Sequence, residues 1–384
     1  MAASGWWRVV PFGLSIGLAG VAVASCGEDV RAPVAPEVDA GDAGVADTRD
    51  AADASGDFPL LKPVVIQDKQ NHPLGIALDS QFVYWINNKD GSVRKLARDA
   101  KPLTEAATLV SGMASPERLA VDGTHVYFTS LSVDASKVVR APLTGGGTFD
   151  VFALGERDPR DILVDATHVY WTNNRDRVVR RQLKASGAAE TVFDVASADG
   201  EPWGIAQFAD KLYVTTYAVG GNIYEHPKTP SFVPDAGDAG ASDAATDAAS
   251  DASGAGGKRA IAIAQDTALA VAVDAANVYW TVKNTGFVLQ IPRTGSGSPL
   301  VLADKQSAPL GIAIDDKYVY WCTNGGEGQL RRVKIGGDPA GSTVLAEKQT
   351  ACSYVVTDGN FVYWTTEGPG TTFFQGSVMA MRLK

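Results

Sequence analysis

One short motif recurs through most of this chain and limits how it can fold. The string Val-Tyr-Trp, or a close variant, occurs seven times, with its tyrosine at Tyr84, Tyr127, Tyr170, Tyr213, Tyr279, Tyr320 and Tyr363. Successive tyrosines lie 43, 43, 43, 66, 41 and 43 residues apart, and removing 23 residues of Ala/Asp-rich sequence from the long interval restores 43. Repeats of this period indicate a fold in which each copy is one structural unit that packs on its neighbours.

Each repeat contains four short runs rich in β-forming residues. In the sixth copy these runs lie at 311–314, 318–321, 329–333 and 342–345, and Gly, Asp and Pro occupy the turns between them. Four antiparallel strands in every 40 to 45 residues are typical of one blade of a β-propeller. The sequence therefore predicts an all-β fold, a seven-bladed β-propeller of four-stranded antiparallel blades.

The ends of the repeated region predict how the ring closes. The last repeat stops at its third strand, near residues 379–384, and the first repeat is preceded by an unassigned β-like run at residues 62–66. If this N-terminal strand pairs with the last blade, it completes a seventh sheet and joins the two ends. Closure protects sheet edges, which an open array leaves unpaired.

The unit resembles the Tyr-Trp-Thr-Asp repeat of low-density-lipoprotein-receptor-type propellers. The resemblance rests on strings such as Ala77-Leu78-Asp79 followed by Val83-Tyr84-Trp85, and Val362-Tyr363-Trp364-Thr365. The Asp that follows Thr in that repeat is absent here, and those receptor propellers have six blades. The broader group of related rings includes the NHL and TolB-type propellers, whose shared property is binding through many chemistries, so the resemblance implies a fold and a binding role without naming a ligand.

The N-terminus has the layout of an export signal. Residues 1–26 contain one base, Arg8, followed by an apolar run that ends in Val23-Ala24-Ser25-Cys26. This resembles the bacterial lipoprotein signal, which implies that Cys26 is lipidated and becomes the mature N-terminus. The alternative is an ordinary cleaved signal with a chance cysteine. Gly27, in place of Asp, favours the outer membrane, with the chain on its periplasmic or surface face.

Two acidic segments flank or interrupt the repeats. Residues 27–58 hold nine acids and two bases, and residues 234–257 hold five acids and no base. They lack large aliphatic side chains, so we expect a disordered tether at 27–58 and a disordered insert at 234–257 within blade 4 of a propeller domain at 59–384. These segments account for the net charge of −10, so the acidity does not indicate a binding face, and no nucleic-acid partner is expected.

One sector of the ring departs from the repeat toward charge and aromatic residues. Just after the proline that begins most first strands, three consecutive copies carry Glu117-Arg118, Arg160-Asp161 and Trp203-Gly204, the seventh carries Ser353-Tyr354, and His72 precedes the first strand of the first copy. Propellers bind ligands where these loops meet the central channel, and Arg and Trp contribute much of the energy at interfaces. The sequence predicts ligand binding at the channel mouth by Glu117, Arg118, Arg160, Asp161, Trp203, Tyr354 and His72.

The alternative for this cluster is purely structural. Glu117 with Arg160, or Arg118 with Asp161, would form salt bridges between neighbouring blades without any ligand. Trp203 needs a separate explanation, because it is the one tryptophan that lies neither in the N-terminal signal nor in the Tyr-Trp motif.

The second set of loops on the same face carries amides and acids: Asn87, Asn88, Asp90, Asn173, Asn174, Asn284, Asn324 and Glu327. Gluconolactonase-like propellers hold a divalent metal with such groups, and streptogramin-lyase-like rings use a metal and a His in a seven-bladed frame. Neither family's diagnostic string occurs here, and Asn-rich strings are also good turns. We therefore expect no catalytic residues, no metal site and no cofactor.

Two further cysteines occupy repeat positions. Cys322 replaces the Thr of the sixth Tyr-Trp-Thr, and Cys352 replaces the proline of the seventh copy, which places both near the same end of adjacent blades. Export to an oxidising compartment favours a disulfide between them, and two buried free thiols are the alternative.

Together these features predict a non-catalytic ligand- or protein-binding propeller lipoprotein of the bacterial cell envelope. We expect a monomer that meets the membrane through the lipid at Cys26 and binds an unknown protein or small molecule. Two alternatives remain: a metal-dependent propeller hydrolase or lyase, and a scaffold subunit of an envelope complex.

Overall fold

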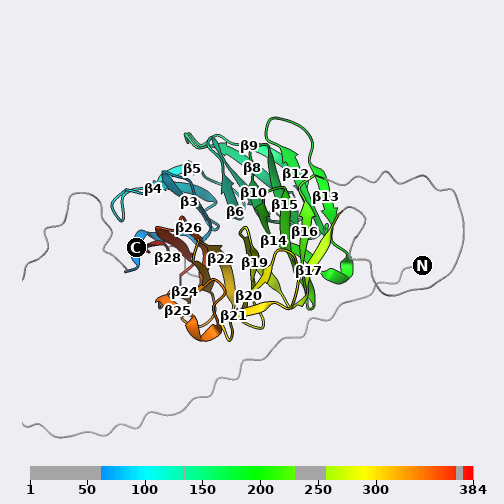
Figure 1. Ribbon diagram of the computed structural model, residues 1–384. Coiled ribbons are helices and arrows are strands. Elements are labelled where there is room, and N and C mark those ends of the chain that lie inside the picture. Colours follow the sequence, from blue (N-terminus) through cyan, green and yellow to red (C-terminus); the bar gives the residue numbers. More distant parts are fainter. Residues whose placement is uncertain (1–61, 133–134, 230–256, 369–374, 384) are drawn as a thin grey trace, which may run out of the picture. The chain divides into compact units, whose positions relative to one another are not determined.

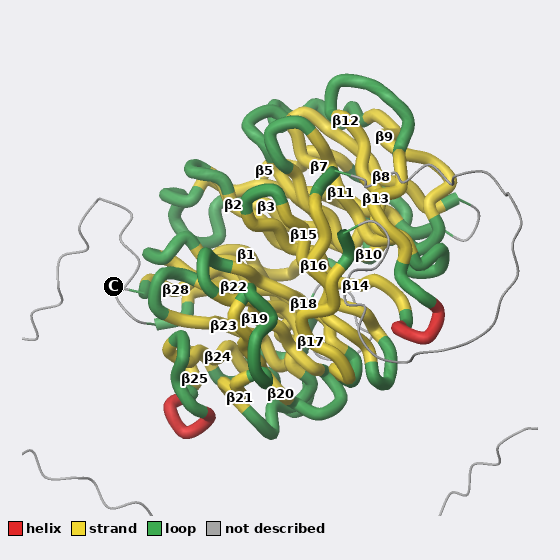
Figure 2. Tube along the Cα trace, turned by 45° about the vertical axis from the view of Figure 1, so that its right-hand side comes forward, coloured by secondary structure: helices red, strands yellow, loops and turns green. Residues whose placement is uncertain are grey.

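The computed structural model describes residues 62–132, 135–229, 257–368 and 375–383, and its described strands form seven four-stranded antiparallel sheets (Figure 1). Each sheet corresponds to one copy of the repeat, so the predicted seven-bladed propeller is confirmed. Helix within the described residues is limited to two short 3₁₀ turns, η1 (Ser197–Asp199) and η2 (Pro339–Gly341), which are red in Figure 2.

The blades follow one another along the chain. Blade 1 comprises β2 (Pro73–Leu78), β3 (Phe82–Asn87), β4 (Ser92–Ala97) and β5 (Ala107–Val110). Blade 2 comprises β6 (Pro116–Val121), β7 (His125–Ser130), β8 (Ser136–Pro142) and β9 (Asp150–Glu156). Blade 3 comprises β10 (Pro159–Val164), β11 (His168–Asn173), β12 (Val178–Leu183) and β13 (Glu190–Asp194).

The remaining blades repeat this order. Blade 4 comprises β14 (Glu201–Phe208), β15 (Lys211–Tyr217), β16 (Gly221–Pro227) and β17 (Arg259–Gln265). Blade 5 comprises β18 (Ala268–Val273), β19 (Asn277–Val282), β20 (Phe287–Pro292) and β21 (Leu300–Ala303). Blade 6 comprises β22 (Pro309–Ile314), β23 (Tyr318–Thr323), β24 (Gln329–Lys334) and β25 (Thr343–Ala346).

Blade 7 contains both ends of the described chain. It comprises β26 (Cys352–Thr357), β27 (Phe361–Thr366), β28 (Gly376–Arg382) and β1 (Val64–Gln70). Strand β1 pairs antiparallel with β28, placing Val64 opposite Ala380 and Gln70 opposite Gly376. The predicted closure by the N-terminal strand is therefore confirmed. The predicted signal with Cys26 and the predicted tether lie outside the described residues, as does most of the predicted insert.

The Tyr-Trp motif forms the core between blades. Successive residues of a strand point to opposite faces of its sheet, so Tyr and Trp in one second strand pack against different neighbouring blades. Tyr84 of blade 1 packs in one cluster with Phe128 of blade 2, whereas Trp85 packs in another with Tyr363 of blade 7. All seven motif tyrosines are at most 1% exposed. Six of the seven blades therefore bury an aromatic residue of the motif on each face, and in blade 4 the buried Val214 takes the place of the Trp.

Candidate functional site

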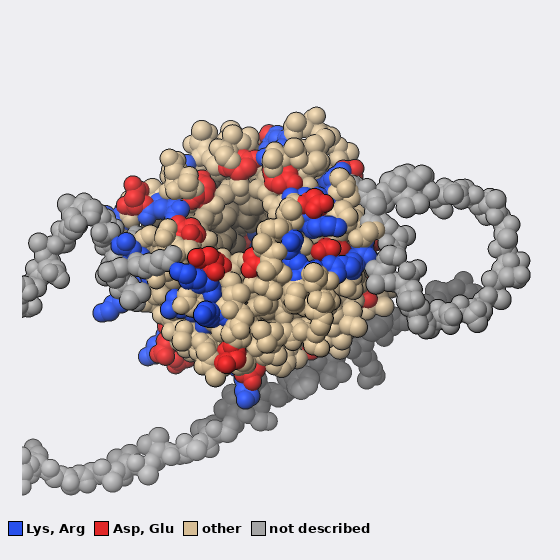
Figure 3. Space-filling model, viewed as in Figure 1, with Lys and Arg blue, Asp and Glu red and all other residues tan. Residues whose placement is uncertain are grey.

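The first strand of each blade lies at the inner end of its sheet. Each first strand contacts the first strands of both neighbouring blades, and together these strands surround the central hollow seen in Figure 3. The approach is close enough to demand glycine in places: a Cβ atom at Gly75 would lie 2.6 Å from the carbonyl oxygen of Glu117, and one at Gly311 would lie 2.7 Å from that of Ser353. Large side chains on the remaining first strands therefore share the limited space of the channel.

The charged residues of blades 2 and 3 pair across the seam between these blades. Arg160 Nη1 lies 3.1 Å from Glu117 Oε2, and its Nη2 lies 3.0 Å from the Asp158 carboxylate. Arg118 Nε lies 3.8 Å from Asp161 Oδ1. Both pairings considered from the sequence are thus present, so Glu117 and Arg160 have a structural role.

Aromatic side chains extend this cluster across the channel. The guanidinium of Arg118 lies 3.2 Å from the ring centroid of Tyr354, which belongs to blade 7, and that of Arg160 lies 4.8 Å from the ring centroid of Trp203. The Trp203 ring lies 4.9 Å from that of Tyr217. The structure therefore brings together Arg118, Arg160, Trp203 and Tyr354, four of the residues proposed from the sequence.

A cavity of about 170 Å³, here called the channel cavity, opens between these side chains. It is lined by residues from blades 2, 4, 5, 6 and 7: Arg118, Trp203, Tyr217, Leu269, Ala270, Lys283, Leu310 and Tyr354. Three of the eight are aromatic and two are basic.

Sequence reasoning missed Tyr217 and Lys283. Both lie four residues after the motif tyrosine, where three other copies have Asn88, Asn174 and Asn324. The departure from Asn at this position was the available signal, but the significance of the position appears only when the second strands are seen to end beside the cavity.

His72 does not line the channel cavity. Its Nε2 atom lies 2.8 Å from Glu367 Oε2, and the Glu367 carboxylate also accepts a hydrogen bond from the Ser353 hydroxyl. His72 follows β1 and Glu367 follows β27, so this pair joins the chain ends at the seam of blades 7 and 1. Its residues line none of the described cavities.

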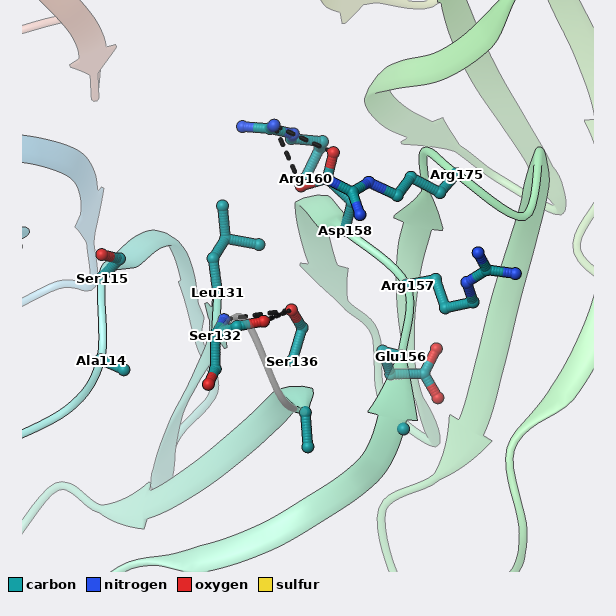
Figure 4. Close-up of a pocket in the computed structure, with 12 residues that line it drawn as sticks. Ala114, Ser115, Leu131, Ser132, Ser136, Glu156, Arg157, Asp158, Arg160 and Arg175 are labelled. Atoms are coloured by element: carbon teal, nitrogen blue, oxygen red, sulfur yellow. Dashed lines mark hydrogen bonds and ion pairs between the residues drawn. The ribbon is translucent and has the colours of Figure 1, made fainter. Parts of the chain in front are cut away.

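A larger, open cavity of about 980 Å³ lies between blades 2 and 3 and is called the outer cavity (Figure 4). Its charged lining residues are Glu156, Arg157, Asp158, Arg160 and Arg175. Arg157 pairs with Asp176 at 3.3 Å, and the buried Glu156 carboxylate accepts hydrogen bonds from Trp171, Asn173 and Arg180. Most of these charges therefore already have partners within the protein.

Burial shifts two titrating groups in the channel. It raises the pKa of Asp161 above its ordinary value, and the Arg118 guanidinium and the backbone N–H groups of Ile205 and Ile162 offset this only in part. It likewise raises the pKa of Tyr354, so that the hydroxyl stays protonated at neutral pH. An unpaired charged group in the channel therefore has a high desolvation cost.

The amide-rich loops mainly hold blades in place. Asn87 donates hydrogen bonds to Gln70 and Ser92, Asn88 donates to the carbonyl of Pro116 in the next blade, and Asn173 donates to Glu156. Among the described residues, no group of three or more His, Cys, Asp or Glu side chains is placed to hold a metal ion. In the same part of the chain, no helix is long and apolar enough to cross a bilayer.

Cys322 and Cys352 are joined by a disulfide, and both are completely buried. The bond connects β23 of blade 6 to β26 of blade 7, and it lies on the channel side of the seam because β26 is a first strand.

Comparison with known proteins supports the fold. No protein-family model and no curated protein matches the chain. Among solved structures, virginiamycin B lyase from Staphylococcus aureus matches with a TM-score of 0.63 at 11% identity, over 84% of this chain and 99% of that chain. A streptogramin B lyase matches with a TM-score of 0.62 at 11% identity, over 83% and 96% of the two chains. The WD40 propeller domain of Doa1 matches with a TM-score of 0.56 at 13% identity, over 83% and 96%. At such identities the likeness establishes the propeller alone.

Proposed function

We propose that this protein is a non-catalytic ligand-binding propeller of the bacterial cell envelope. It is anchored to the membrane by lipid at Cys26 and binds its ligand at the channel mouth. The channel cavity carries the proposal. Its wall combines three aromatic rings with two basic side chains, whereas the first strand of blade 1 has only Leu74-Gly75 at the equivalent position and does not line the cavity. Concave sites with apolar walls and a few polar groups are the usual form of small-molecule sites.

Trp203 provides the test of this binding role. We expect fragments that bind the full chain in ligand-observed NMR to bind Trp203→Ala about tenfold more weakly, because the indole forms one wall of the cavity and aromatic anchors commonly contribute more than 1 kcal/mol. Phe149→Ala, which removes a 42% exposed aromatic ring immediately before β9, serves as the matched control. Equal binding of every fragment to wild type and Trp203→Ala would refute the proposed site.

The anchor is tested separately. With an alkyne-labelled fatty acid in the growth medium, we expect the wild-type chain to carry label and to sediment with membranes, and Cys26→Ser to lose the label and become soluble. An acyl chain contributes about 0.8 kcal/mol per buried methylene, so several chains hold a protein on a bilayer. Ser25→Ala is the control at the neighbouring position. Membrane retention of unlabelled Cys26→Ser would show that the cysteine is not the anchor.

A metal-dependent propeller hydrolase or lyase is the second candidate, and the likeness to virginiamycin B lyase and streptogramin B lyase is the observation that favours the lyase. One equivalent of divalent metal in the purified protein would support the enzyme. A scaffold subunit of an envelope complex is the third candidate. Envelope proteins that co-purify with the wild-type chain but not with Trp203→Ala would support it.

A further inference from the structure

The size of the channel cavity limits its occupant. Cavities of about 150 Å³ lined by apolar side chains accommodate one benzene molecule. The channel cavity measures about 170 Å³, and Trp203, Tyr217, Tyr354, Leu269 and Leu310 provide its apolar wall. A single six-membered ring with a short substituent therefore matches the available space.

Arg118 supplies hydrogen-bond donors without acceptors. Its side chain is only 13% exposed, yet its nearest carboxylate, that of Asp161, lies 3.8 Å from Nε, beyond hydrogen-bond distance. The two Asp161 oxygens already accept hydrogen bonds from the backbone N–H groups of Ile162 and Ile205. No other residue in the described ranges accepts a hydrogen bond from the Arg118 side chain, in contrast to Arg160, which Glu117 and Asp158 both satisfy. A guanidinium whose N–H donors lack acceptors can bind both oxygens of a ligand carboxylate in a bidentate pair.

The charge of the cavity wall favours the same ligand chemistry. Arg118 and Lys283 line the cavity, and none of its eight lining residues is acidic. Lys283 is exposed at the rim and forms no ion pair with the described part of the chain. Aromatic walls can also attract cations, but Arg118 already occupies the face of Tyr354 and Arg160 that of Trp203. The Arg118 charge is balanced by the Asp161 carboxylate beside it, and Lys283 adds a positive charge that no ion pair within the described residues balances.

We propose that the channel cavity binds an aryl carboxylate, with the aromatic ring between Trp203, Tyr217 and Tyr354 and the carboxylate on the guanidinium of Arg118. This inference rests on the proposed function and specifies its ligand class. Lys283 at the rim attracts the anion as it approaches, so binding weakens with added salt.

Phenylacetate is the probe, and phenylacetamide is its neutral isostere. In calorimetric titrations of the full chain at low salt, we expect phenylacetate to bind at least tenfold more tightly than phenylacetamide and phenethylamine. Arg118→Gln should weaken phenylacetate at least tenfold and leave phenylacetamide unchanged. Arg118→Lys, which keeps the charge but loses the planar fork, should give an intermediate loss.

Arg293→Gln is the matched control, because the Arg293 guanidinium also lies over an aromatic ring, 4.2 Å from the centroid of Phe208, but outside the channel cavity. Circular dichroism checks that each variant is folded. If Arg118→Gln does not fold, the exposed Lys283→Gln replaces it, with an expected loss of about threefold for phenylacetate at low salt.

Two results would overturn the inference: equal affinities of phenylacetate and phenylacetamide for wild type, or unchanged phenylacetate affinity in the folded Arg118 variants. If fragments bind in a Trp203-dependent manner without preferring the carboxylate, the ligand class is wrong and the binding role stands. If no fragment depends on Trp203, both proposals fail.

Discussion

A single aspartate organises the turn between the first and second strands in most blades. In blade 3, Asp165 Oδ1 accepts hydrogen bonds from the backbone N–H groups of Thr167 and His168, and Oδ2 accepts one from the Tyr170 hydroxyl at 3.0 Å. This arrangement explains why an aspartate recurs five residues before the motif tyrosine. Where Phe208 replaces it in blade 4, Glu225 accepts the hydrogen bond from Tyr213 instead, at 2.9 Å. The repeat thus conserves an acceptor for a buried phenol, because an unpaired one costs free energy.

The same turn predicts a pH dependence of stability. Burial tends to raise the pKa of Asp165, but the backbone N–H groups of His168 and Thr167, the Tyr170 hydroxyl and the Lys228 ammonium lower it from 3.8 to about 2. The unfolded chain therefore binds this proton more readily than the folded chain. The stabilisation is complete above pH 3.8 and is lost as the pH falls toward 2.

We expect Asp165→Asn to be less stable than wild type at neutral pH and to show a smaller fall in its urea midpoint between pH 4 and pH 2. Asp150→Asn, at a side chain that is 69% exposed, should follow the wild-type curve. Parallel curves for wild type and Asp165→Asn would show that this carboxylate does not contribute.

Neighbouring blades are joined by two sets of side-chain hydrogen bonds between elements. In five seams, the indole N–H of the motif tryptophan donates a hydrogen bond to a side-chain oxygen fifteen residues earlier in the sequence. The acceptor lies on the preceding blade or on the loop that follows that blade. The acceptors are Gln70, Glu156, Gln265, Gln306 and Gln349. Blade 2 has Phe128 in place of Trp, and the position fifteen residues earlier is Met113. Phe128 has no N–H to donate, and with Met113 at the other position no buried acceptor is left without a hydrogen bond. Phe128 and Met113 pack in the same hydrophobic cluster.

The second set uses the threonine of the motif. In blade 4, Thr215 accepts a hydrogen bond from the N–H of Gly204 at 2.8 Å and donates one to the carbonyl of Leu269 in the next blade at 2.5 Å. Equivalent threonines make this link at four other seams, through Thr129, Thr172, Thr281 and Thr365. In blade 6 the position is Cys322, and the disulfide to Cys352 connects the seam covalently instead.

The disulfide should therefore contribute more than the hydrogen bond that it replaces. It joins residues 30 apart, for which the chain-entropy model gives about 3 to 4 kcal/mol, whereas a buried hydrogen bond contributes about 1 kcal/mol. We expect Cys322→Thr/Cys352→Ala to lose about 2 to 3 kcal/mol of unfolding free energy, measured by urea denaturation without reductant.

Reductant should affect the wild-type chain only after unfolding, because both cysteines are completely buried. Cys26→Ser, which retains the disulfide, is the control. If the double variant and the wild type unfold at the same urea concentration, the bond does not stabilise the seam.

At the scale of the whole molecule, ring closure places distant residues side by side. Arg118 and Tyr354 are far apart in sequence, yet their blades flank blade 1, where Leu74-Gly75 leaves room between them. The number of blades and the closing strand were predictable, because the aromatic motif and the missing fourth strand are local patterns. The cluster of Arg118, Arg160, Trp203 and Tyr354 was predictable as a departure from the repeat.

Other parts of the site were not predictable from these patterns. Lys283 and Tyr217 resemble ordinary loop residues, and Leu269 and Leu310 resemble the unmodified repeat, until their blades converge on one cavity. Glu117 and His72 were also predicted as ligand-binding residues; Glu117 pairs with Arg160, His72 pairs with Glu367, and neither lines the channel cavity.

The sequence by itself determined the blade, its count and its closure, because alternation along a strand and burial of the motif side chains on both faces act over a few residues and repeat with each copy. Only the tertiary structure decided which side chains face a common space and which of them are already satisfied. Those properties depend on the direction and separation of side chains from five different blades. Whether two groups form an ion pair or a hydrogen bond depends on the distance between their atoms, and residues far apart in sequence can lie within that distance.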